Sequence, residues 1–170
     1  GKVVMFHFWS FTCPWEKVAE PKLNQLATDF KGKEVVIVAI NANRGEIGEQ
    51  PDATAWSAKE AKDKPYHGLR KQLEKVNHKV LFDHNGEVAR LAGAKTTPHV
   101  FVVDKQGLLA YAGGLDNDGK SGEVDAKGQY ARLGLVEVQY AAEQQRPQIG
   151  DRRPYGVSCG PEGVPKAHGA

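Results

Sequence analysis

The stretch of sequence that decides the fold is VVMFHFWSFTCPWE, residues 3–16. Its first half, from Val3 to Trp9, is a nearly unbroken run of β-branched and aromatic residues, which predicts a strand buried on both faces. From about Trp15 to Phe30, apolar residues recur at helical spacing. Pro21 lies inside that segment, and we expect it to kink or split the helix. The stretch therefore predicts a buried strand that leads directly into a helix.

Cys13 lies where this strand meets this helix. In helix positions, Cys13 is the N-cap and Pro14 is the first helical residue, where the missing N–H of proline is not needed. A thiolate at a helix N-terminus faces unpaired backbone N–H groups and the positive end of the helix dipole, and both favour the anion. We interpret Cys13 as a reactive thiol; the alternative is a buried structural cysteine.

The rest of the chain alternates between strand-like and helix-like patterns. We expect strands at residues 35–40, 80–83, 100–103 and 108–112, and helices at residues 53–62, 69–76, 87–91 and 130–145. The first two strands, which are joined through a helix, should be parallel, and residues 104–107 have the turn chemistry of an antiparallel hairpin. The fold class is therefore α/β, with a mixed central sheet between helical layers.

We divide the chain into one domain, residues 1–145, and an extended C-terminal tail, residues 146–170, which holds four prolines and five glycines. Residues 44–64 form an insertion that either rims the active site or decorates the sheet edge. The chain begins at Gly1 rather than at methionine, which we interpret as a trimmed N-terminus. Any targeting signal is then invisible, and the sequence does not indicate a compartment.

Composition excludes several classes of protein. With 40% hydrophobic and 26% charged residues in 170, wholesale disorder is not expected. The net charge of +2, without a basic stripe, argues against nucleic-acid binding, and no apolar run is long enough for a membrane span. Two cysteines are too few for a disulfide scaffold, and with six histidines they show no zinc spacing. We expect no metal and no organic cofactor.

Two segments resemble the thioredoxin-like superfamily. FWSFTCPWE, residues 8–16, resembles its active-site segment, and TTPHVFVVD, residues 96–104, resembles its second signature, in which the proline is cis and faces the active-site cysteine. Residues 38–43, 88–94 and 113–118 resemble bacterial redoxin-domain proteins of the AhpC/TSA, peroxiredoxin-like branch. The resemblance covers about residues 1–145 and implies a thioredoxin-like three-layer fold with a cis bond before Pro98.

Two departures from these families bear on the chemistry. Thioredoxins have a second cysteine three residues after the first, where this chain has Glu16, so the motif itself cannot run a vicinal dithiol cycle. Peroxiredoxins often read Cys-Pro-x-Glu, which residues 13–16 match, but Phe6 stands where they have an upstream proline. The segment therefore has features of both groups.

Glu16 and His7 are candidates for proton transfer. As the third residue of the helix, Glu16 has an ordinary capping interpretation, in which its side chain bonds back to the N-cap backbone. The alternative is that it passes a proton to a leaving thiol or alkoxide. The position of His7 corresponds to the buried acid that many thioredoxins use as a proton acceptor, so His7 is either a general base or a core histidine.

The resemblance also implies a substrate-binding region. In the resembled fold, the residue before the cis proline pairs its backbone with the substrate chain, which here assigns contact roles to Thr97 and Pro98. Pro14 and Trp15, beside Cys13, complete the predicted substrate contacts. We expect His99 to lie on a strand surface.

Cys159 lies in the tail, in the segment YGVSCG. Fourteen residues separate it from Gln145, a span of up to roughly 46 Å, so reaching Cys13 is easy. Related redoxin-domain proteins often end in a Gly-Cys motif, which this segment resembles imperfectly. Cys159 is either a resolving thiol for oxidised Cys13, an idle thiol, or one that pairs with another chain.

The sequence thus predicts a thiol–disulfide oxidoreductase with Cys13 as nucleophile, resolved by Cys159 or by an external thiol. Its partners would be a protein or small-molecule disulfide or peroxide and an external thiol reductant. One alternative is a peroxiredoxin-like peroxidase, which needs a donor such as Arg44 or Arg90 near the thiol. The other is a non-catalytic redox-sensing or binding module.

Overall fold

The computed structural model describes residues 1–48, 73–117, 130–140, 157–159 and 165–166. The helix expected at 53–62, the first half of the helix expected at 69–76 and most of the 44–64 insertion lie outside the described residues. Within them, the strands and helices expected from the sequence are present, with bounds that differ by one or two residues at most ends.

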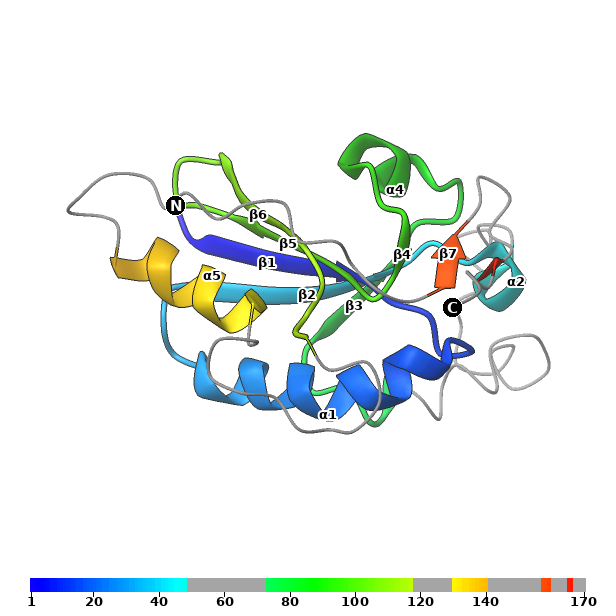
Figure 1. The fold of residues 1–170 in the computed structure, drawn as a ribbon, viewed down its shortest axis with the longest axis horizontal. Coiled ribbons are helices and arrows are strands. Elements are labelled where there is room, and N and C mark those ends of the chain that lie inside the picture. Colours follow the sequence, from blue (N-terminus) through cyan, green and yellow to red (C-terminus); the bar gives the residue numbers. More distant parts are fainter. Residues whose placement is uncertain (49–72, 118–129, 141–156, 160–164, 167–170) are drawn as a thin grey trace, which may run out of the picture.

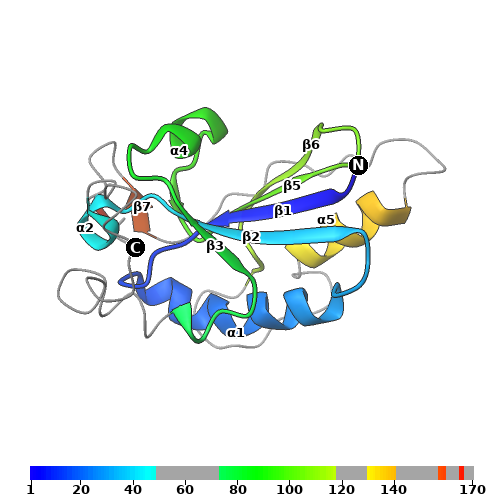
Figure 2. The same cartoon turned by 180° about the vertical axis from the view of Figure 1, so that it is seen from behind.

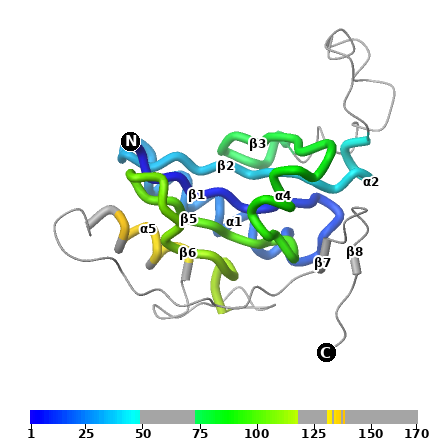
Figure 3. The backbone as a smooth tube through the Cα atoms, turned by 90° about the horizontal axis from the view of Figure 1, so that it is seen from above, coloured from blue at the N-terminus to red at the C-terminus, as the bar shows by residue number. Residues whose placement is uncertain are grey.

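A five-stranded mixed sheet forms the middle of the molecule (Figure 1). Its strands are β1 (Val3–Phe8), β2 (Val35–Asn41), β3 (Lys79–Phe82), β5 (His99–Val103) and β6 (Leu109–Gly113), in the order β3-β2-β1-β5-β6. β2 runs parallel to both β1 and β3, whereas β5 is antiparallel to β1 and β6. The expected parallel pair and the expected hairpin are confirmed. Figure 3 shows β1 lying between β2 and β5.

Helices cover both faces of this sheet (Figures 1 and 2). α1 (Pro14–Asp29) and α5 (Tyr130–Tyr140) lie against one face, and α4 (Glu87–Ala92) lies against the other. The main core forms under α1 and α5, where Met5 and Val100 of the sheet pack with Leu23 and Leu135 of the two helices. On the opposite face, Phe8, Ile40 and Phe101 pack beneath α4. The predicted three-layer α/β fold is confirmed.

α1 runs from Pro14 to Asp29 without a break, so the splitting expected at Pro21 is wrong. Proline removes one backbone hydrogen bond from a helix interior. On either side of it, however, Ala19, Leu23 and Leu26 are buried against the sheet. Burial of such side chains contributes about 1.5–3 kcal/mol each for the larger ones, which offsets the missing bond.

The tail takes part in a second, small sheet that the sequence analysis did not predict. It consists of β4 (Thr96–Thr97), β7 (Val157–Cys159) and β8 (Pro165–Lys166), in the order β4-β7-β8. β7 is antiparallel to β4, with Thr97 opposite Val157 and Thr96 opposite Ser158. β7 therefore lies beside β4, as Figure 1 shows, and β4 directly precedes Pro98 in the chain. A short helix, α2 (Arg44–Ile47), was also not predicted.

Candidate active site

Cys13 is the N-cap of α1, and Pro14 is the first residue of the helix, as expected. The Cys13 side chain is 2% exposed, and its Sγ donates a hydrogen bond to the carbonyl oxygen of Thr97 at 3.1 Å. The Thr97–Pro98 peptide bond is cis, as the resemblance implied. Two segments 84 residues apart thus meet at one sulfur atom.

Glu16 lies in the first turn of α1 and is 2% exposed. The capping interpretation is wrong, because the backbone N–H of Cys13 donates instead to the carbonyl of Ser10. Neither carboxyl oxygen of Glu16 makes a hydrogen bond of standard geometry among the described residues, although the Ser10 backbone N–H lies near enough to lower its pKa. Burial raises the pKa of Glu16 well above its usual range, and the nearby charges of Cys13, Glu20 and Glu46 raise it further. The neutral carboxylic acid is therefore favoured, within one helical turn of the thiol.

His7 is fully buried on β1. It lies on the face of the sheet covered by α1, since residues two apart on a strand share a face and Met5 packs in the core beneath that helix. Its Nε2 lies 3.1 Å from Nε2 of His78, and its Nδ1 has no partner within the described part of the chain. Burial, and then the charge of His78, lower the pKa of His7 to about 3. A histidine with so low a pKa is a weak proton acceptor at neutral pH.

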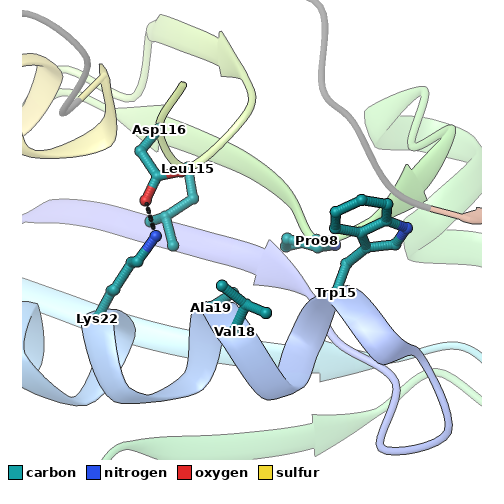
Figure 4. Close-up of a pocket in the computed structure, with 7 residues that line it drawn as sticks. All are labelled: Trp15, Val18, Ala19, Lys22, Pro98, Leu115 and Asp116. Carbon is teal, nitrogen blue, oxygen red and sulfur yellow. Dashed lines mark hydrogen bonds and ion pairs between the residues drawn. The ribbon is translucent and has the colours of Figure 1, made fainter. Parts of the chain in front are cut away.

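A shallow groove runs along α1 beside Pro98 (Figure 4). In Figure 4, Trp15 and Pro98 lie at one end, and the ion pair between Lys22 and Asp116 lies at the other, with Nζ and Oδ2 2.9 Å apart. The remaining lining residues are the apolar Val18, Ala19 and Leu115. Of the residues predicted to contact substrate, Trp15 and Pro98 line this groove, Thr97 bonds the thiol, and Pro14 is exposed at the helix start.

The buried carboxylate of Glu46, in α2, was missed by the sequence analysis. It is 3% exposed and accepts hydrogen bonds from the residues that precede Cys13. The donors are the Ser10 hydroxyl, the Phe11 N–H, the Thr12 N–H and hydroxyl, and the side-chain amides of Asn41 and Asn43. The sequence does contain one indication of a structural role for Glu46, because it follows the N-cap residue Asn43 by three positions, the spacing of a capping box.

The remaining candidates lie as follows. In β7, Ser158 is opposite Thr96, the first residue of β4, so the backbone of Cys159 lies one residue past the end of β4, opposite Pro165 of β8. His99 is buried rather than on a strand surface, because its Nδ1 accepts the Lys95 N–H and its ring packs on Phe101. Arg90 bonds the Asn85 carbonyl on an exposed part of α4.

Two further properties concern only the residues that the structure describes. They contain no group of three or more histidine, cysteine, aspartate or glutamate side chains that could hold a metal ion. They also contain no helix of the length and apolarity that a membrane crossing requires.

Comparison with known proteins identifies the family of the chain. The model of the AhpC/TSA family matches residues 1–112. No curated protein matches the chain. Among solved structures, an uncharacterized conserved protein from Geobacillus kaustophilus is 24% identical with a TM-score of 0.69, over 92% of this chain and 76% of its own.

Two other structures share the fold. A hypothetical protein from Sinorhizobium meliloti is 22% identical with a TM-score of 0.68, over 92% of this chain and 78% of its own. The exposed lipoprotein thioredoxin Etrx1 of Streptococcus pneumoniae is 21% identical with a TM-score of 0.53, over 80% of this chain and 85% of its own. The chain belongs to the AhpC/TSA family, and its domain is a thioredoxin-like redoxin domain.

Proposed function

We propose that this chain is a thiol–disulfide oxidoreductase whose nucleophile is Cys13. The observation that carries the proposal is the position of the Cys13 thiol, at the N-terminus of α1 and 3.1 Å from the carbonyl that precedes the cis Pro98. Membership of the AhpC/TSA family and the similarity of fold to a thioredoxin support the same class of reaction. A thiolate attacks disulfides without a metal or an organic cofactor.

The reaction begins when the Cys13 thiolate attacks one sulfur of a substrate disulfide. A bond forms between that sulfur and Cys13 Sγ, the substrate S–S bond breaks, and the second substrate sulfur leaves as a thiolate. A second thiol then attacks Cys13 Sγ and releases the first substrate sulfur. The substrate gains two electrons, and the oxidised protein is returned to its starting state by an external thiol reductant.

Glu16 is the proposed proton donor to the leaving thiolate. Its carboxyl group is buried, makes no hydrogen bond of standard geometry among the described residues and is favoured in the protonated state. A buried neutral acid close to the reacting sulfur can protonate a leaving group that would otherwise return. His7 is the weaker candidate for proton transfer, because its pKa of about 3 leaves little basicity at neutral pH.

Cys159 is the proposed resolving thiol, with an external thiol as the alternative. The support is that β7, which ends at Cys159, pairs with the strand that contains Thr97. In the present register Val157 lies opposite Thr97. A slide of β7 by two residues along β4 would bring Cys159 opposite Thr97.

The same pairing suggests where substrate binds. An extended peptide can add to the edge of β4 in place of β7, using the backbone of Thr97. Its side chain beside the disulfide would then pack over the shallow groove next to Trp15 and Pro98. The apolar lining favours an apolar substrate side chain, and the Lys22–Asp116 pair closes the far end.

Turnover of a fluorescent peptide disulfide, driven by a dithiol reductant, tests the proposal. Cys13→Ser should abolish turnover, and Cys159→Ser should slow it if the tail resolves the intermediate. Turnover of hydrogen peroxide is measured alongside. A Cys13→Ser variant that retains wild-type turnover of the disulfide would refute the proposal, and turnover of peroxide alone would favour the peroxidase alternative.

A further inference from the structure

Glu46 receives more hydrogen bonds than any local role requires. A capping glutamate needs to bond only one backbone N–H at its own helix start. The carboxylate of Glu46 instead accepts the backbone N–H groups of Phe11 and Thr12, at 3.1 and 3.0 Å, and the hydroxyls of Ser10 and Thr12. These partners lie 34–36 residues away in the chain and come from three consecutive residues.

Those three residues lead directly into Cys13. The carbonyl of Ser10 also accepts the backbone N–H of Cys13, so that a shift of the segment would move the helix start and its sulfur. On its other side, Glu46 is held by the side-chain amides of Asn41, at 2.7 Å, and Asn43, at 3.0 Å. The carboxylate therefore ties the segment before Cys13 to the end of β2 and to α2.

We propose that Glu46 is a positioning residue, whose carboxylate fixes Ser10–Thr12 and thereby holds the Cys13 thiol against the carbonyl of Thr97. The inference deepens the proposed function, on which its relevance to turnover rests. A charged acceptor in a buried network forms stronger hydrogen bonds than a neutral one, and a glutamine in its place would turn an NH₂ group toward one set of donors.

Glu46 also acts on Glu16 through its charge. The groups that raise the pKa of Glu16, besides burial, are Cys13 and Glu20 on α1 and Glu46 on α2. Removing the charge of Glu46 should therefore lower the pKa of Glu16, whereas loosening the segment without removing the charge should not. This difference separates the electrostatic contribution from the geometric one.

The test compares Glu46→Gln with wild type in the full chain, using iodoacetamide and a mass-spectrometric count of alkylated Cys13. Because the thiol is buried, a loosened segment should raise its alkylation rate by about tenfold, while disulfide turnover falls by about 10- to 100-fold. NMR titration of the Glu16 carboxyl should move to lower pH. Asp83→Asn is the matched control, since Asp83 is also a buried carboxylate but bonds the backbone of Ala89.

Alkylation and titration in Glu46→Gln that both match wild type would overturn the proposal. Should that variant fail to fold, Thr12→Val removes one donor hydroxyl and keeps the charge. It should raise Cys13 alkylation several-fold with the Glu16 titration unmoved, and an unchanged alkylation rate would equally overturn the proposal. Neither readout requires a disulfide substrate, so a failure of the proposed function alone would leave both results intact.

Discussion

Replacing His7 by phenylalanine should make the protein less sensitive to acid. Burial and the charge of His78 lower the pKa of His7 to about 3, from an ordinary value of 6.5. Below pH 6.5 the unfolded chain therefore binds a proton at His7 that the folded chain does not bind. The free energy of unfolding then decreases as the pH is lowered from 6.5 to about 3. The His7→Phe variant lacks this proton and should lose less stability over the same range.

The size of the effect follows from the shift. With the pKa of His7 shifted to about 3, each pH unit between 6.5 and 4 lowers the free energy of unfolding by about 1.4 kcal/mol. By pH 4, the wild type should therefore lose about 3 kcal/mol more of its free energy of unfolding than His7→Phe. The comparison concerns the change with pH, since loss of the hydrogen bond to His78 can lower the variant's stability at every pH.

Urea unfolding at pH 7 and at pH 4, followed by the fluorescence of the three tryptophans, measures this change. Met5→Leu is a suitable control, because it alters packing two residues away on the same strand without changing a titratable group. It should keep the wild-type dependence on pH. If His7→Phe lost as much stability as the wild type between the two pH values, the reasoning on His7 would be wrong.

Three further predictions concern Glu16, the tail and the core. The raised pKa of Glu16 means that the folded state binds a proton more tightly than the unfolded state, so the free energy of unfolding falls as pH rises above 4.5. Glu16→Gln should remove this loss, which urea unfolding at pH 5 and pH 8 measures. A dependence on pH equal to that of the wild type would contradict the assignment. Ser158→Pro should break the pairing of β7 with β4 and so free the edge of β4 for substrate. The KM of a peptide disulfide should then fall about fivefold for each hydrogen bond that is freed. An unchanged KM would exclude competition between the tail and the substrate. Leu23→Ala, at a side chain 1% exposed, should reduce the free energy of unfolding by about 2–5 kcal/mol in urea, and a loss below about 1 kcal/mol would contradict the packing described.

The parts of the fold that could be predicted depend on local signals. Val3–Phe8 is apolar throughout and Cys13-Pro14 has the residue types of a helix start, so β1, α1 and their junction follow from neighbouring residues. The hairpin of β5 and β6 follows from its turn, where Asp104 accepts the N–H groups of Gln106 and Leu108. Pro21 misled the prediction because its local effect is outweighed by packing that involves distant residues.

The missed parts depend on contacts between distant residues. Pairing of β7 with β4 joins residues about 60 positions apart, and strands of two or three residues have no periodicity to detect. The role of Glu46 depends on donors from another loop, so its own neighbours in sequence indicate only a helix cap. The capping prediction for Glu16 failed for a local reason, because the Cys13 N–H donates to the carbonyl of Ser10, three residues earlier.

The most direct test of the central claim is a peptide map by mass spectrometry under non-reducing conditions, after one equivalent of oxidised glutathione. If Cys13 is the nucleophile, the map should show glutathione on Cys13 or, after resolution, a disulfide between Cys13 and Cys159. Glutathione on Cys159 with Cys13 unmodified would contradict the account.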